Sequence, residues 1–302
     1  MATRAPKPKS TPTKAKTVPA GKWPHAGIPV VDGHVHVNRF DLMTPAAQAL
    51  IRQNPTFHLM QEFQADATAF LEHMDREGIR QAWLVNYCAK EVMGYGWEVN
   101  DWIGGYVEAD PTRLVAVGGY DPRHDGDGEE AVGKLADLGI RALKIHAVHQ
   151  HLRPDGRRLR PALRECERRG MPVIFHTGTS KFPGASNKFG SPSRLRKVCQ
   201  TFPKLKVVIA HGGRPDETQE ALAILAEFPN AWLDVSSCPP KKLPDYFGDL
   251  EALAPRTLWG SDWPGPGVPG MGKNVESFLA LGLSEKANRM ILHDNAATLI
   301  GP

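Results

Sequence analysis

Two histidines separated by one residue, His34 and His36, close a short β-branched run near the start of the chain. In an extended strand successive side chains alternate between two faces, so both imidazoles are expected on one face, while Val35 and Val37 occupy the other. Imidazole nitrogens bind zinc and other divalent transition metals. The pair therefore predicts part of a chelate, and a metal site needs further ligands from elsewhere in the chain.

Three later residues with suitable side chains stand where apolar runs end. His176 and His211 each close such a run, and Asp262 directly follows a third. Taken singly, each side chain could cap a helix or bind a loop amide. Together with His34 and His36 they indicate one polar site, because barrel enzymes carry their active sites at the carboxyl ends of the strands.

The elements that would position these residues alternate regularly from residue 28 onward. Eight short runs are expected as strands, at residues 29–37, 81–86, 114–119, 142–146, 172–176, 207–211, 231–235 and 256–261. Amphipathic segments are expected as helices, at residues 66–77, 127–138, 158–169, 192–202, 216–228 and 284–300. Repeated strand–helix units predict the α/β class and a closed (β/α)8 or TIM barrel. No Gly-rich phosphate turn follows the first run, which disfavours an open doubly wound sheet.

Two connections, at residues 38–62 and 87–112, exceed the usual length of a loop between a strand and a helix. We expect them to hold additional helices beside the site. Composition supports one large domain, since 41% of the 302 residues are hydrophobic and 23% are charged. Four scattered cysteines show no metal-binding spacing and are expected to be reduced and structural: Cys88, Cys166, Cys199 and Cys238.

The formal net charge of +4 originates at the start of the chain. Residues 1–24 hold six Lys or Arg and no acidic residue, so residues 25–302 carry a net charge of −2. We expect residues 1–24 to form a disordered basic tail rich in Pro, Thr and Lys, and residues 25–302 to form the barrel domain. A secretory signal and a long apolar run are both missing, which predicts a cytoplasmic protein with no membrane partner. The dispersed charges without aromatic residues predict no nucleic-acid partner.

Five short motifs are shared with a known group of enzymes. They are the Asp-Gly-His-Val-His opening, Leu-Lys-Ile-His at 143–146, Ile-Ala-His-Gly-Gly at 209–213, Trp-Gly-Ser-Asp-Trp-Pro at 259–264 and Asn-Ala-Ala-Thr-Leu at 295–299. Through these motifs, the chain over roughly residues 28–300 resembles the amidohydrolase superfamily, in particular its amidohydrolase-related branch. That branch includes aminocarboxymuconate-semialdehyde decarboxylase, resorcylate-type decarboxylases, and lactone or amide hydrolases. The resemblance is therefore specific for the family and not for a substrate.

The resemblance implies a role for each residue of the candidate site. His34, His36, His176 and Asp262 are expected to be metal ligands, and Asp262 is also expected to take a proton from the attacking water. His211 is expected beside the metal as an acid, a base or a stabiliser of developing charge. One Zn²⁺ is the expected ion, with Mn²⁺ or a site of two metals as the alternatives.

Lys144 leaves two interpretations open. Some superfamily members use a carboxylated lysine at this strand to bridge two metals, whereas a lysine that stays an ammonium could pair with a carboxylate or hold an anionic substrate. One metal is favoured, since many members of this branch are mononuclear. Arg39 and Arg214 are candidates to bind a substrate carboxylate. His149 follows the Lys144 strand in a polar loop and is expected at the surface.

Three functions remain to be weighed. The favoured one is a metal-dependent hydrolase that activates water to attack an amide, ester or lactone of a small organic substrate. The first alternative is a non-oxidative decarboxylase of a small aromatic or unsaturated carboxylic acid. The second alternative is a non-catalytic metal-binding barrel, which would have no use for residues placed as His211 and Asp262 are. A homodimer is compatible with each of the three.

Overall fold

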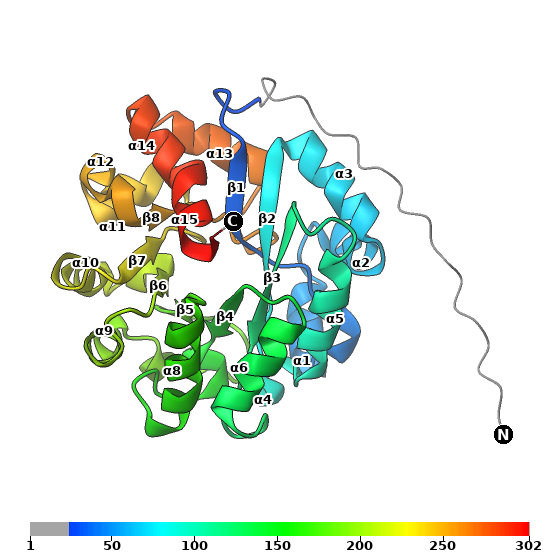
Figure 1. Ribbon diagram of the computed structural model, residues 1–302. Coiled ribbons are helices and arrows are strands. Elements are labelled where there is room, and N and C mark those ends of the chain that lie inside the picture. The colour runs from blue at the N-terminus through cyan, green and yellow to red at the C-terminus, as the bar shows by residue number, and fades with distance from the viewer. Residues whose placement is uncertain (1–23, 302) are drawn as a thin grey trace.

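A computed structural model describes residues 24–301, so the tail predicted at residues 1–24 lies outside the described residues except for Pro24. Eight parallel strands form one sheet in sequence order, and helices surround them (Figure 1). The predicted TIM barrel is confirmed. Its strands are β1 (Val30–Val35), β2 (Ile79–Val85), β3 (Leu114–Gly119), β4 (Ala142–Ile145), β5 (Val173–His176), β6 (Val207–Ala210), β7 (Ala231–Asp234) and β8 (Thr257–Leu258).

The barrel closes through the segment that follows β8. The amide of Gly33 donates to the carbonyl of Trp259 at 2.9 Å, and the amide of Asp262 donates to the carbonyl of His34 at 2.8 Å. A regular strand was predicted as far as residue 261, but β8 has only two residues. The next residues approach β1 closely at Gly260, where a Cβ would lie 2.6 Å from the Cβ of His34. This close contact brings Asp262 alongside the two histidines.

The predicted amphipathic helices are confirmed to within a few residues. They are α3 (Ala67–Glu77), α6 (Gly128–Asp137), α8 (Arg160–Arg169), α9 (Leu195–Thr201) and α10 (Thr218–Glu227). Asp66 and Asp127 cap α3 and α6 because their carboxylates accept hydrogen bonds from amides of the first turn. Gly78 and Gly170 end α3 and α8 in the left-handed conformation, which glycine adopts without steric cost.

The last predicted helix is divided into three parts. Ser284 caps α14 (Glu285–Arg289), a π-helical turn spans Met290–Asp294, and α15 (Asn295–Ile300) follows. Further helices are α7 (Ala147–Gln150), α11 (Leu243–Phe247), α12 (Leu250–Leu253) and α13 (Met271–Leu279).

The two long connections contain helices, as predicted. The first holds α1 (Pro45–Ile51) and α2 (Phe57–Ala65), and the second holds α4 (Lys90–Met93) and α5 (Glu98–Val107). They are joined at Thr44, whose amide donates to the carbonyl of Met93 and whose hydroxyl donates to that of Val92, each at 2.9 Å. The connections after β1 and β2 therefore form one packed unit.

Strand alternation separates the core into two layers. In β5, Val173 and Phe175 pack with the helices, whereas Ile174 belongs to the cluster inside the barrel. The same alternation places His176 on the inner face, at the carboxyl end of the strand. The four cysteines are buried and unpaired, in agreement with the sequence prediction. Among residues 24–301, no helix is long and apolar enough to cross a membrane.

Candidate active site

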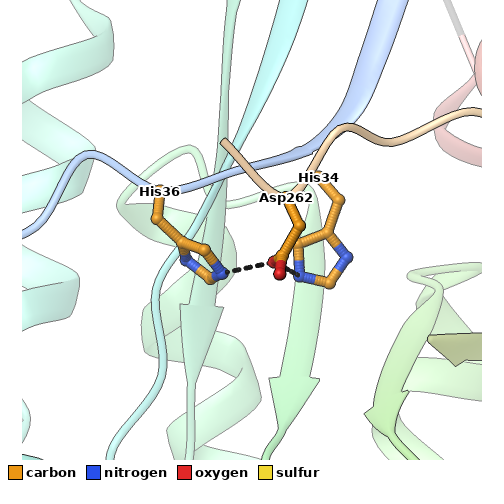
Figure 2. A group of neighbouring side chains, drawn as sticks. All are labelled: His34, His36 and Asp262. Carbon is orange, nitrogen blue, oxygen red and sulfur yellow. Dashed lines mark hydrogen bonds and ion pairs between the residues drawn. The ribbon is translucent and has the colours of Figure 1, made fainter. Parts of the chain in front are cut away.

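His34, His36 and Asp262 meet at the carboxyl end of the barrel (Figure 2). One ligand atom from each of the three lies within 4.8 Å of the other two. Oδ1 of Asp262 is 3.2 Å from Nε2 of His36 and 3.7 Å from Nε2 of His34. Both imidazoles therefore turn the same nitrogen toward the same carboxylate oxygen.

The outer nitrogens of the two imidazoles are held by groups that accept hydrogen bonds. Nδ1 of His34 lies 2.6 Å from a carboxylate oxygen of Asp234, and Nδ1 of His36 lies 2.7 Å from the carbonyl oxygen of Val85. A carboxylate and a carbonyl can only accept, so Nδ1 is the nitrogen that donates in each ring. In the neutral ring, Nε2 then carries a lone pair, and both lone pairs face Asp262.

This arrangement fits a divalent metal ion. Three electron-pair donors that converge on one point repel one another unless a cation lies between them. Histidine ligands in metal sites donate their other ring nitrogen to a carboxylate or a carbonyl, as His34 and His36 do here. His34, His36 and Asp262 are thus suited as ligands, with Asp234 and the Val85 carbonyl orienting two of them.

His176 stands next to this group without belonging to it. Its ring centroid lies 4.8 Å from that of His211. Nε2 of His176 is buried and has no hydrogen-bond partner among residues 24–301. Burial lowers the pKa of His176 well below its usual value, so the ring is neutral and offers a lone pair. An unpartnered buried nitrogen is what a fourth ligand would present before the ion binds.

Asp262 remains a carboxylate although it is buried. Burial by itself would raise the pKa of Asp262, but the imidazoles of His36, His211 and His34 around the carboxylate hold its pKa well below the usual range. The backbone of Asp262 has a φ of 64°, in the left-handed region. This conformation, fixed by the amide hydrogen bond to His34, turns the side chain toward the two histidines.

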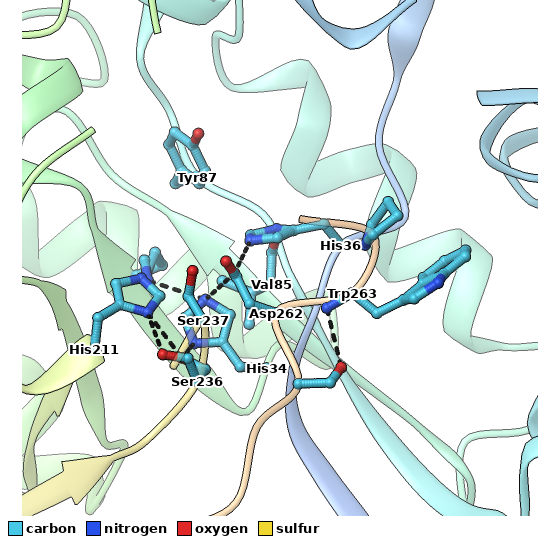
Figure 3. A network of polar contacts seen from close by, with 12 residues as sticks. His34, His36, Val85, Tyr87, His211, Ser236, Ser237, Asp262 and Trp263 are labelled. Atoms are coloured by element: carbon cyan, nitrogen blue, oxygen red, sulfur yellow. Dashed lines mark hydrogen bonds and ion pairs between the residues drawn. The ribbon is translucent and has the colours of Figure 1, made fainter. Parts of the chain in front are cut away.

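His211 is positioned by the segment after β7 (Figure 3). Its Nδ1 donates to the carbonyl of Ser236 at 3.1 Å and is 2.9 Å from the hydroxyl oxygen of the same residue. Burial lowers the pKa of His211 to about 3, so the ring is neutral at pH 7 and Nε2 carries a lone pair. Its centroid lies 5.0 Å from that of His34. His211 therefore borders the three-residue group without belonging to it.

Lys144 points into the barrel and is 1% exposed. Its Nζ lies 3.3 Å from Nε2 of His34. Burial lowers the pKa of Lys144 to about 8, and the charges of Asp234 and Asp262 oppose that change. The ammonium thus contacts the same nitrogen that faces Asp262.

The amidohydrolase family model matches residues 31–301. The chain belongs to the amidohydrolase family. The resemblance seen in the sequence is thereby confirmed, and membership of this family identifies the chain as an enzyme. The sequence matches no curated protein.

Several solved structures share the fold of this amidohydrolase. An uncharacterized TIM-barrel protein from Bordetella bronchiseptica has 24% identity and a TM-score of 0.71, covering 89% of this chain and 97% of its own. A probable 2-pyrone-4,6-dicarboxylic acid hydrolase from Acinetobacter baumannii has 18% identity and a TM-score of 0.68, with coverages of 91% and 100%. A 5-carboxyvanillate decarboxylase from Novosphingobium aromaticivorans, solved with bound manganese, has 14% identity and a TM-score of 0.63, with coverages of 90% and 96%. Hydrolases and decarboxylases both occur among these folds.

The two predicted substrate-binding arginines of this amidohydrolase differ in their surroundings. Arg39 lies against Asp41, with Nη2 2.6 Å from a carboxylate oxygen, and its guanidinium is 5.9 Å from the centre of the Trp102 ring. Arg214 donates to the hydroxyl of Ser237, its Nε is buried without a partner, and no carboxylate of residues 24–301 pairs with it. Arg214 is therefore better suited than Arg39 to receive an anionic group.

The prediction that His149 lies at the surface is wrong. The residue is 1% exposed, because α7 begins directly after β4 and its first turn folds His149 back against His146. The spacing of three residues between the two histidines was the available signal, since residues at i and i+3 share one face of a helix. Asp234, at the end of β7, was also missed, although it follows the pattern of a polar residue at a strand end.

Proposed function

We propose that this chain is a metal-dependent hydrolase that attacks an amide, ester or lactone bond of a small organic substrate. The observation that carries the proposal is the convergence of two imidazole nitrogens on Asp262, beside a neutral His211. His34, His36 and Asp262 would hold the ion, with His176 as the fourth ligand. A divalent ion, when bound, supplies Lewis acidity and makes water nucleophilic near neutral pH.

The residues of the chain divide the remaining steps between them. The carboxylate of Asp262 accepts the proton of the attacking water, because it is ionised and adjoins the site of the ion. His211, a neutral ring held through Nδ1, faces the reacting group through Nε2 and takes up or returns a proton there. Lys144 remains an ammonium in this proposal, favoured by the carboxylates of Asp234 and Asp262.

Arg214 supports a substrate that carries an anionic group. Its guanidinium lacks a carboxylate partner within residues 24–301, and Ser237 fixes its position. A guanidinium is suited to bind a carboxylate through two parallel hydrogen bonds. The same feature favours the second candidate function, decarboxylation of an aromatic or unsaturated acid, in which Arg214 would hold a substrate carboxylate.

The ion proposed is a single Zn²⁺, because imidazole nitrogens and a carboxylate oxygen are ligands that zinc binds in proteins. Mn²⁺ is the alternative, supported by the manganese in the Novosphingobium decarboxylase structure. We also retain from the sequence a single barrel domain and a cytoplasmic location. The proposed partner is a small-molecule substrate, without nucleic acid or membrane, and a homodimer is the proposed assembly.

The test combines elemental analysis with a substrate screen. Protein purified without added metal is analysed for bound ions, then loaded with Zn²⁺ or Mn²⁺ and assayed against lactones, amides and hydroxylated aromatic acids. Ring opening or amide cleavage without carbon dioxide release is the expected result. Carbon dioxide release from an aromatic acid would instead establish the decarboxylase. Full turnover after removal of all metal would contradict both.

A further inference from the structure

A column of three stacked imidazoles lies on one side of the candidate metal site. The ring of His146 lies between two others, with its centroid 3.6 Å from that of His149 and 3.8 Å from that of His176. The interplanar angles are 14° and 15°, so the three rings are nearly parallel. The column therefore ends at one proposed metal ligand, His176.

The outer end of the column is fixed by hydrogen bonds on both sides of His149. Its Nδ1 lies 3.1 Å from the hydroxyl of Tyr87, and its Nε2 lies 2.7 Å from the hydroxyl of Ser180. These partners come from the segments after β2 and β5, so they clamp the His149 ring from two directions. Such a clamp leaves the ring little freedom to rotate.

The middle ring is fixed from its own helical turn. Nδ1 of His146 accepts from the amide of His149 at 3.3 Å, and the amide of His146 donates to the side chain of Gln150 at 2.9 Å. Gln150 in turn donates to the carbonyl of Tyr120 at 2.8 Å. His146 is 5% exposed, so the column is a buried and hydrogen-bonded unit.

His176 differs from the other two histidine ligands in what orients it. His34 and His36 each donate through Nδ1 to a fixed acceptor, whereas neither ring nitrogen of His176 has a hydrogen-bond partner among residues 24–301. A ligand without such a partner can rotate about its side-chain torsions unless packing prevents it. The face of His146 supplies that packing.

We propose that His146 and His149 are positioning residues that hold the His176 ring, by stacking, in the orientation that binds the metal. The inference rests on the proposed function, because it requires a metal at this site. Loss of an outer partner of a metal ligand commonly weakens metal affinity by about 10-fold to 100-fold. Loss of the stack should have an effect in the same range.

The experiment measures Co²⁺ binding by absorbance titration of the metal-free full chain. His146→Leu removes the ring, His146→Phe keeps a flat ring in its place, and His58→Leu changes a histidine that is exposed on α2. We expect His146→Leu to raise the Co²⁺ dissociation constant by about 10-fold or more, and to change the visible absorption spectrum of bound Co²⁺. His146→Phe should stay within about threefold of the wild-type chain, and His58→Leu should match it.

Three results would overturn the inference. Equal losses in His146→Leu and His146→Phe would assign the effect to the imidazole nitrogens and not to stacking. Wild-type affinity and spectrum in His146→Leu would show that the column does not position His176. A wild-type chain that binds no Co²⁺ would refute the proposed metal site itself, and the inference with it.

A second pair keeps the test decisive if His146→Leu does not fold. His149→Leu and His149→Phe alter the ring one layer farther from the ligand. We expect a loss of a few-fold in affinity for His149→Leu and a smaller loss for His149→Phe. No difference between the two, with thermal unfolding showing both folded, would contradict the stacking role.

Discussion

His211 is the residue at which metal binding and chemistry can be separated, and His211→Asn is the suitable change. The backbone of His211 has a φ of 65°, a conformation that asparagine tolerates better than most residues. The amide nitrogen of asparagine can take the place of Nδ1 and still donate to the carbonyl of Ser236. The substitution therefore removes Nε2 while it keeps the backbone and the outer hydrogen bond.

The expected loss follows from what Nε2 does in the proposed mechanism. Removal of a general acid or base, or of one donor to a developing oxyanion, lowers kcat by about 10²-fold to 10³-fold. That range corresponds to about 2.7 to 4 kcal/mol of transition-state stabilisation. Bound metal should stay at the wild-type level, since His211 is held by Ser236 and is not one of the four proposed ligands, His34, His36, His176 and Asp262.

The assay measures bound metal and kcat on the same preparation, with the substrate found in the screen. Full metal content with a collapsed kcat supports a catalytic role. Loss of bound metal would show that His211 is a ligand. Retention of both the metal and kcat would refute the catalytic role and leave His211 with a structural role only. His211→Gln serves as a matched variant, because its longer side chain can place an amide N–H nearer to the position of Nε2. Equal losses of kcat in His211→Gln and His211→Asn indicate proton transfer, whereas a smaller loss in His211→Gln would indicate hydrogen bonding to developing charge.

Three further predictions concern the surroundings of the proposed metal ligands and the pH dependence of stability. Asp234→Asn should weaken metal affinity by about 10-fold to 100-fold in a metal titration, because a neutral amide orients His34 less firmly than a carboxylate does. Lys144→Met should tighten metal binding without changing a stoichiometry of one, because it removes a buried ammonium 3.3 Å from a ligand nitrogen; loss of metal would instead indicate a bridging lysine. Burial lowers the pKa of His149 to about 3. Below about pH 6.5 the unfolded chain therefore binds a proton at His149 that the folded chain does not bind. The free energy of unfolding consequently falls as the pH drops from 6.5 toward 3. When measured by urea unfolding, the free energy of unfolding of His149→Gln should change less steeply with pH than that of the wild-type chain in this window, by up to about 1.4 kcal/mol per pH unit.

The barrel could be predicted because its signals are local and repeated. Strands such as β1 and β6 are short runs rich in β-branched residues, and α3 is an amphipathic helix with capping residues at Asp66 and Gly78. The end of the last strand could not be predicted from the same pattern. β8 stops after Leu258 because the following residues must pass close to His34, and that contact depends on two distant segments.

The candidate site was predictable to the extent that its residues stand at strand ends. His34, His36 and Asp262 are brought together as barrel closure requires. Strict alternation would place His211 on the face of Ile209, which packs with the helices. A positive φ at His211 turns its ring back toward the site, and no propensity of histidine in a single sequence indicates that reversal. His149 was misplaced for a related reason, since its burial depends on partners from two other connections.

The protonation states at the site are compatible with the first step of the proposed hydrolysis. Asp262 is ionised and His211 is neutral at pH 7, so both offer lone pairs and neither holds a proton to donate there. Lys144, whose pKa is about 8, does carry a proton that it could donate, but it lies inside the barrel against His34. Attack by water begins with the loss of a proton to a nearby acceptor, whereas decarboxylation of an aromatic ring requires a proton to be delivered to carbon. The lone pairs of Asp262 and His211 beside the proposed metal therefore agree with the proposed hydrolysis, and the substrate screen tests it.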